Sequence, residues 1–69
     1  MNKIGIIVAM EKELEPILEY YTDAKEVLNK AGYTFLSTKV NHNEIIMTCC
    51  GIGKTNAACA AQIMIDNLN

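Results

Sequence analysis

The sequence predicts an α/β fold, in which strands alternate with helices around a largely buried sheet. The chain opens with an apolar run over residues 4–10 that lacks polar alternation, which is typical of a strand buried on both faces. This run changes directly into acidic residues and an apolar stripe at helical spacing. A second apolar segment, over residues 44–50, is followed by a glycine-containing turn and a second helical stretch. Two such strand-to-helix units favour the α/β class.

The first helix is expected over about residues 12–21, with Leu14 beginning its apolar stripe. Pro16 is expected near the first turn, because proline is tolerated there and breaks helical hydrogen bonds further along. Glutamates at positions 11, 13 and 15 suit the positive end of the helix dipole. Ligands of open α/β sheets bind at the carboxyl ends of strands, so Glu13 is the first candidate for chemistry. From spacing alone, a surface acid that complements the dipole is its more frequent role.

The middle of the chain predicts a hairpin. Residues 24–31 are compatible with either a helix or an edge strand, and Gly32 ends this segment. Residues 33–40 are rich in β-branched and aromatic side chains, which favours a strand. Residues 41–43 form a polar turn, and residues 44–50 return as a paired strand. His42 is expected on the surface of this turn rather than in a metal site, because no partner stands at ligand spacing.

Residues 51–53, Gly-Ile-Gly, predict a tight turn into a final helix that begins near Lys54 or Thr55. The turn and these two residues resemble the end of a phosphate-binding P-loop. That motif needs another glycine five residues before Gly53, where Thr48 stands. The dinucleotide-binding motif also fails, because Asn56 occupies its third glycine position. A glycine-permitted turn is favoured, and the P-loop is the minor alternative, in which Lys54 would bind a nucleoside triphosphate.

Composition excludes several classes of protein. The chain has 69 residues, a formal charge of −2 and 51% hydrophobic residues, so it can build a small core and is not a disordered tail. The acidic balance gives no basic surface for nucleic acid or an anionic membrane. Three cysteines without disulfide or metal spacing predict reduced thiols in the cytoplasm. No signal peptide is predicted, and no apolar run reaches the roughly 20 residues that span a bilayer.

Two stretches together resemble the 5′-methylthioadenosine/S-adenosylhomocysteine nucleosidases of the purine nucleoside phosphorylase-like superfamily. They are residues 4–13, Ile-Gly-Ile-Ile-Val-Ala-Met-Glu-Lys-Glu, and residues 51–54, Gly-Ile-Gly-Lys, followed by an alanine-rich helix. The final helix leads to no further strand, so residues 1–69 are expected to be an incomplete nucleosidase/phosphorylase-like α/β domain. The resemblance implies the N-terminal part of a mixed sheet flanked by helices, in the order strand, helix, strand, strand, strand, helix. It therefore makes residues 24–31 a strand.

The resemblance also implies a reaction. These enzymes use water to cleave the adenine–ribose bond of an adenine nucleoside, releasing adenine and a thioribose product without a metal or cofactor. An aspartate protonates the adenine and a glutamate activates the water, while carboxylates stabilise the oxocarbenium-like transition state. By motif position, Glu13 matches the water-activating glutamate. Ala9 and Met10 match residues that border the ribose and the water, and Ile52 matches an apolar contact to the ribose and the 5′-thio group.

Two positions depart from the family pattern, since Val8 stands where glycine is common and Cys50 where serine is usual. The proton donor, the adenine-binding loop and the ribose ligands of the family are expected beyond Asn69, so the chain alone should be nearly inactive. The resemblance also implies a cytoplasmic homodimer that acts in methionine salvage. One alternative is a phosphorolytic relative, against which the absence of arginine weighs. Another is a non-catalytic segment that associates through open sheet edges.

Overall fold

The computed structural model describes residues 2–68, without the Lys54 side chain. Its elements are β1 (Asn2–Val8), α1 (Glu11–Tyr20), β2 (Lys25–Lys30), β3 (Tyr33–Val40), β4 (Asn43–Cys49) and α2 (Lys54–Leu68). This order of strands and helices is the predicted one. The segment that was compatible with either helix or strand forms the strand β2.

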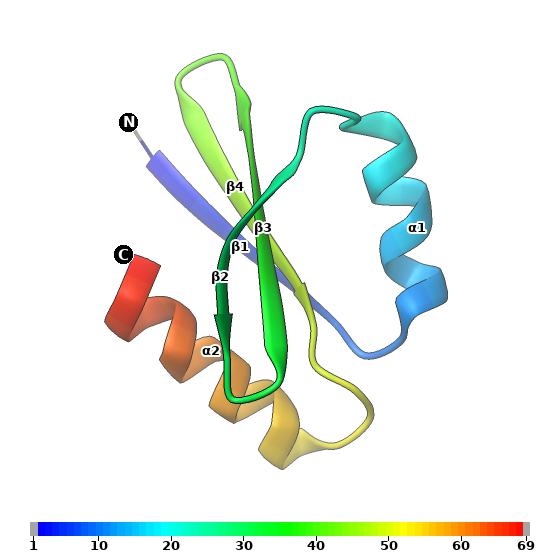
Figure 1. The fold of residues 1–69 in the computed structure, drawn as a ribbon, viewed down its shortest axis with the longest axis vertical. Helices are drawn as coiled ribbons and strands as arrows, with labels where there is room; N and C mark the ends of the chain where they lie inside the picture. The colour runs from blue at the N-terminus through cyan, green and yellow to red at the C-terminus, as the bar shows by residue number, and fades with distance from the viewer. Residues whose placement is uncertain (1, 69) are drawn as a thin grey trace.

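The four strands form one mixed sheet in the order β1-β4-β3-β2. β1 and β4 run parallel, whereas β4, β3 and β2 form an antiparallel meander, which confirms the predicted hairpin. The two helices lie on opposite sides of the sheet (Figure 1). A Cβ atom added at Gly5 would come within 2.5 Å of Met64 Sδ, so glycine in β1 lets α2 lie close to the strand.

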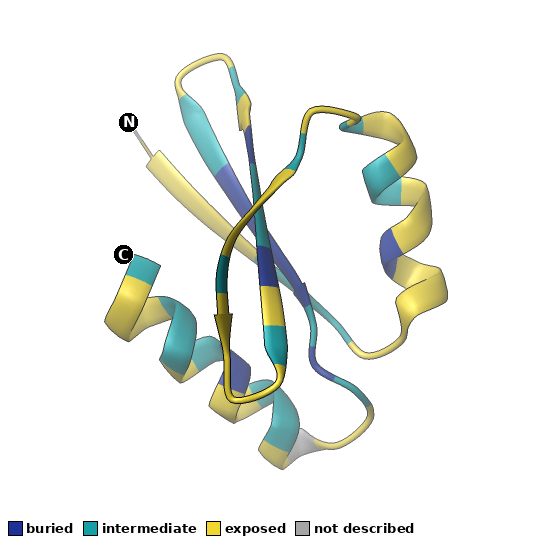
Figure 2. Ribbon diagram, viewed as in Figure 1, coloured by how far each residue is buried: buried dark blue, intermediate teal, exposed yellow. Residues whose placement is uncertain are grey.

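The core is centred on β4, as the dark blue residues of Figure 2 show. On the α1 side, Leu14 packs with Ile45 and Met47 in one buried cluster. Residues 45–48 of β4 are all buried, because this strand has a neighbour on each edge and a helix over each face.

The expectation that the first strand is buried on both faces is wrong for this structure. Residues 2–5 of β1 are exposed and residues 6–8 are half-buried. β1 occupies an edge of the described sheet and pairs only with β4, so one row of its backbone groups faces no strand within residues 2–68. Ile4, in this edge strand, keeps 46% of its surface exposed.

Pro16 also lies elsewhere than predicted. α1 begins at Glu11, so Pro16 is the sixth residue of the helix and falls in its second turn. A proline at this position cannot donate the hydrogen bond that would reach the carbonyl of Lys12. The amphipathic packing of the helix, with Leu14 buried and Ile17 and Leu18 beside the core, keeps the helix continuous through the proline.

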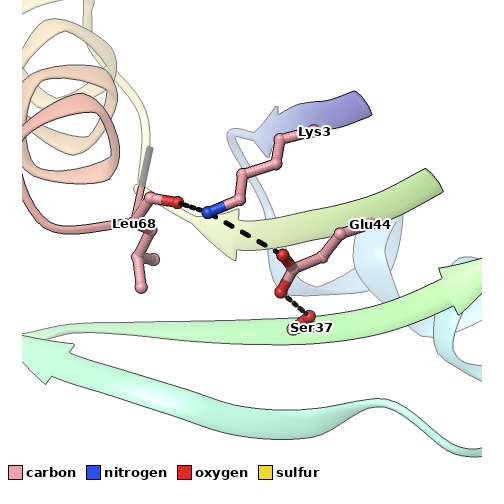
Figure 3. A network of polar contacts seen from close by, with 4 residues as sticks. All are labelled: Lys3, Ser37, Glu44 and Leu68. Atoms are coloured by element: carbon pink, nitrogen blue, oxygen red, sulfur yellow. Dashed lines mark hydrogen bonds and ion pairs between the residues drawn. The ribbon is translucent and has the colours of Figure 1, made fainter. Parts of the chain in front are cut away.

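Lys3, at the start of β1, joins the sheet to the end of α2 (Figure 3). Its Nζ donates a hydrogen bond of 2.6 Å to the carbonyl oxygen of Leu68 and lies 4.0 Å from Glu44 Oε1. Glu44 Oε2 in turn accepts a hydrogen bond of 2.6 Å from Ser37 Oγ. A cation at the C-terminus of a helix is favourable because it meets the last carbonyl groups. This network therefore fixes where α2 ends relative to β1, β4 and β3.

Neither helix within residues 2–68 is long and apolar enough to cross a membrane.

Candidate functional site

The parallel pairing of β1 and β4 brings two candidate segments to the same edge of the sheet. Val8 is paired with Cys49, and the N–H of Cys50 donates a 2.9 Å hydrogen bond to the carbonyl of Val8. Beyond this pair the chain leaves each strand at its carboxyl end (Figure 1). The β1–α1 loop contains Ala9 and Met10, and the β4–α2 loop contains Ile52. The fold thus places the two loops together at the edge where α/β sheets bind ligands.

Glu13 belongs to the first turn of α1, directly after the first loop. Its Oε1 accepts a 3.0 Å hydrogen bond from the backbone N–H of Met10, and its own N–H donates a 3.0 Å bond to the Met10 carbonyl. Met10 has an extended backbone, which is usual for the residue before a helix. The carboxylate therefore folds back onto the β1–α1 loop and satisfies a backbone donor there, as the glutamate of a capping box does.

All four predicted site residues are exposed in the structure. Met10 has 38% and Ile52 has 77% of its surface accessible, and Ala9 and Glu13 are also exposed. The arrangement presents one fixed carboxylate and several apolar groups on an open surface. Such a surface can hold a water molecule at the carboxylate and contact an apolar substituent. The described residues do not enclose a substrate at this edge.

The β4–α2 turn has the predicted glycine-dependent geometry. Gly51 and Gly53 have φ values of 82° and 127°, which side chains with a Cβ rarely adopt. The chain then enters α2, where the N–H of Ala57 donates to the Gly53 carbonyl over 3.2 Å. The prediction of a turn is confirmed. The P-loop alternative depends on the side chain of Lys54, which lies outside the described residues.

Two residues near the turn were not found by the sequence analysis as parts of the site. Asn56 Nδ2 donates a 3.1 Å hydrogen bond to the carbonyl of Ile52, and Asn56 Oδ1 accepts a 3.4 Å bond from the Tyr33 hydroxyl. In the sequence, Asn56 stands out only as the residue at the third glycine position of the dinucleotide-binding motif. The signal that could have identified it is an amide side chain standing alone at the start of an alanine-rich helix.

The two residues that depart from the family pattern lie where β1 and β4 end, directly before the two loops. Val8 packs against the core cluster on the α1 side. Cys50 is buried, and its thiol donates to the carbonyl of Gly51 over 3.0 Å. His42 occupies the turn between β3 and β4, as predicted. Within residues 2–68 no three His, Cys, Asp or Glu side chains are grouped closely enough to hold a metal ion.

Known nucleosidases resemble this chain over nearly all its length. The 5′-methylthioadenosine/S-adenosylhomocysteine nucleosidase of Staphylococcus epidermidis is 39% identical over 66 residues, which are 96% of this chain and 28% of that protein. A mutant of the Helicobacter pylori nucleosidase, solved with 5′-methylthioadenosine in its active site, superposes with a TM-score of 0.84 at 35% identity, covering 94% of this chain and 28% of that one.

A structure from Helicobacter pylori that is described as a futalosine hydrolase superposes with a TM-score of 0.83 at 35% identity, covering 93% of this chain and 28% of that one. The chain therefore spans a little over a quarter of the length of the relatives that it matches. The sequence model described as the Phosphorylase superfamily matches residues 3–69. Since this match takes in nearly every residue, the chain belongs to the Phosphorylase superfamily.

Proposed function

We propose that this chain supplies the water-activating part of the active site of an N-glycosidic hydrolase. The substrate would be 5′-methylthioadenosine or S-adenosylhomocysteine, and the products adenine and a thioribose compound. The observation that carries the proposal is the Glu13 carboxylate, which is fixed by the Met10 N–H beside the carboxyl end of β1. Relatives named for this activity support it, at 39% and 44% identity over more than nine-tenths of the chain.

In this proposal each residue has a separate role. Glu13 accepts a proton from the attacking water and stabilises the positive charge that develops on the ribose. Its bond to the loop backbone holds one carboxylate oxygen, so the carboxylate is oriented before substrate arrives. Ala9 and Met10 border the ribose and the water. Ile52, exposed on the neighbouring loop, provides an apolar contact for the 5′-thio substituent.

The remaining groups that the reaction requires would come from outside this chain. Protonation of the adenine and recognition of the ribose hydroxyls need further polar side chains, which the resemblance to the nucleosidases leads us to expect beyond Asn69. We therefore expect the 69-residue chain to release adenine at a rate near background. A cytoplasmic homodimer that acts in methionine salvage completes the proposal, and the free thiols of Cys49, Cys50 and Cys59 are consistent with a reducing compartment.

Phosphorolysis is a second candidate, because the matching family is described as the Phosphorylase superfamily. A phosphate nucleophile is usually bound by arginine, whose planar guanidinium forms paired hydrogen bonds with phosphate oxygens. All six basic residues of this chain are lysines. Water is therefore the favoured nucleophile, and a dependence of adenine release on added phosphate would favour phosphorolysis instead.

The proposal can be tested in a chimeric enzyme. Residues 1–69 replace the matching segment of the Helicobacter pylori nucleosidase, and release of the purine base is measured from methylthioadenosine, adenosylhomocysteine and futalosine, with and without phosphate. Glu13→Gln should lower turnover by roughly 10²- to 10⁴-fold, because it removes the base that accepts the proton of water. The glutamine retains an oxygen that can accept from the Met10 N–H, so the helix start should be preserved.

Glu15→Gln is the matched control, since Glu15 is an exposed acid two residues further along the same helix. It should leave turnover within about two-fold of the parent chimera, as surface substitutions usually have small effects. A folded chimera in which Glu13→Gln retains full turnover would refute the assignment of Glu13.

A further inference from the structure

Asn56 lies between the candidate site and the rest of the sheet. It is the third residue of α2, and both the nitrogen and the oxygen of its amide group form hydrogen bonds. Nδ2 donates to the carbonyl of Ile52, which precedes the helix, while Oδ1 accepts from the hydroxyl of Tyr33. One half-buried side chain therefore joins the β4–α2 loop to the first residue of β3.

The loop that Asn56 contacts has few other restraints. Its two glycines adopt backbone conformations with positive φ, and Ile52 between them is 77% exposed, so packing contributes little to holding this residue. Cβ atoms added at Gly51 and Gly53 would lie 3.7 and 3.8 Å from Asn56 Nδ2. The amide thus sits inside the bend of the loop, against both glycines.

Tyr33 holds the amide from the other side. It is the first residue of β3 and pairs with Lys30 of β2. Its backbone is therefore held in the meander, and its side chain is half-buried. A hydroxyl that donates to Oδ1 also decides which end of the amide faces Ile52, because the Nδ2 end must then point toward the carbonyl.

We propose that Asn56 is a positioning residue, which holds Ile52 in place for substrate through its bond to the Ile52 carbonyl and is itself oriented by Tyr33. This role rests on the proposed function, in which Ile52 contacts the 5′-thio group. The restraint is exerted on the loop rather than on the helix, because the Ile52 carbonyl belongs to a residue outside α2. The hydrogen bonds of the Asn56 amide reach Ile52 and Tyr33, and neither of these residues is Glu13, the proposed base.

The chain contains a close internal control. Asn67 Nδ2 donates over 2.9 Å to the carbonyl of Ile63, four residues earlier, and Asn67 Oδ1 accepts from Lys30 Nζ over 3.3 Å. The chemistry and spacing match those of Asn56, but both Ile63 and Asn67 lie within α2. Only Asn56→Asp removes a bond to the loop, so Asn67→Asp is the control for the lost amide donor. The two also differ in the helix dipole, which favours an acid at position 56 and disfavours one at position 67.

The test compares Asn56→Asp, Tyr33→Phe and Asn67→Asp by nuclear magnetic resonance of the 69-residue chain. Aspartate at position 56 can still accept from Tyr33 but cannot donate to Ile52, whereas Tyr33→Phe removes only the hydroxyl. Backbone order parameters of Ile52 and Gly53 should be near those of rigid backbone, about 0.85, in the parent, and fall toward 0.6 in both variants. Asn67→Asp should leave them unchanged.

Stability separates positioning from a general loss of structure. An acid in the first turn of a helix interacts favourably with its dipole, so Asn56→Asp should not lower the urea midpoint while the loop loses order. Unchanged order at Ile52 in Asn56→Asp would overturn the proposal. An equal fall in the order parameters throughout α2 would also overturn the proposal.

A titration of the chimeric enzyme with methylthioadenosine, followed at the Ile52 methyl signals, links the loop to the substrate. Loss of one hydrogen bond of ordinary net strength should weaken binding by roughly 2- to 12-fold in Asn56→Asp. If the parent chimera and its variants all fail to bind the nucleoside, the proposed function fails. The order parameters then still decide whether Asn56 positions the loop.

Discussion

Ala31 has a left-handed backbone conformation, with φ of 56°, in the turn between β2 and β3. An alanine in this region is less stable by about 1–2 kcal/mol, because its Cβ crowds the following carbonyl oxygen. Gly32 follows with φ of 84°, so both turn residues have the positive φ values of a tight hairpin turn. Asparagine tolerates the first of these positions better than alanine does.

We therefore expect Ala31→Asn to raise the free energy of unfolding by about 0.5–1 kcal/mol, since Asn-Gly is a favoured pair in such turns. Urea denaturation followed by circular dichroism measures the change. Gly32→Ala serves as the opposite control. A Cβ at this position meets no atom within 4 Å, so any loss of stability reports backbone conformation alone. If Ala31→Asn lowers stability, the turn does not have the described geometry.

At the scale of single residues, the sequence predicted the features that depend only on neighbouring residues. The glycine turn at residues 51–53 and the acidic first turn of α1 follow from backbone sterics and the helix dipole, and both are present. The bond between Tyr33 and Asn56 joins residues 23 positions apart. Spacing gives no information on such a pair until the path of the meander is known.

At the scale of the elements, α1 contains a residue that lowers its stability. Pro16 is exposed in its second turn, where its missing N–H leaves a helical carbonyl without its usual partner. Pro16→Ala should raise the free energy of unfolding by about 1–3 kcal/mol, less the entropy that proline removes from the unfolded chain. Equilibrium unfolding in urea tests this.

Glu15→Ala is a suitable comparison, because it alters the adjacent exposed position without changing the backbone donors. It should change stability by less than about 0.5 kcal/mol. A Pro16→Ala variant no more stable than Glu15→Ala would mean that the helix accommodates the proline without cost.

The strands were predicted in type and order but not in their burial. An uninterrupted apolar run indicates how well a strand suits burial, and says nothing about how many neighbours it has. β1 and β4 both show such a run, yet β4 is central and β1 lies at an edge of the described sheet. The position of a strand in a sheet depends on how all the strands assemble. This is why the burial of β1 could not be predicted from its own sequence.

The two edge strands of the described sheet differ in chemistry. β2 contains Lys25, Glu26 and Lys30 and has a register shift between Glu26 and Leu28, both of which discourage pairing with another strand. β1 is regular in register and mostly apolar, with Ile4 46% exposed. The chain by itself should therefore self-associate at high concentration through β1 rather than β2.

Ile4→Lys should reduce this association, because a charge on the edge strand opposes edge-to-edge pairing. Val27→Lys on β2 is the matched control, since Val27 is exposed to 45%. Sedimentation velocity over a range of concentrations compares the two variants with the parent. Equal behaviour of the variants, or a parent that stays monomeric throughout, would contradict a special role for the β1 edge.

The parallel pairing of β1 with β4 also has a consequence for synthesis of the chain. β1 leaves the ribosome before its partner strand, which begins only at Asn43. The β2–β3–β4 meander joins strands that are adjacent in sequence, and such local contacts form readily. At ordinary translation rates the apolar first strand waits for a time on the order of seconds. β1 is therefore synthesised before the meander but is paired after the meander has formed.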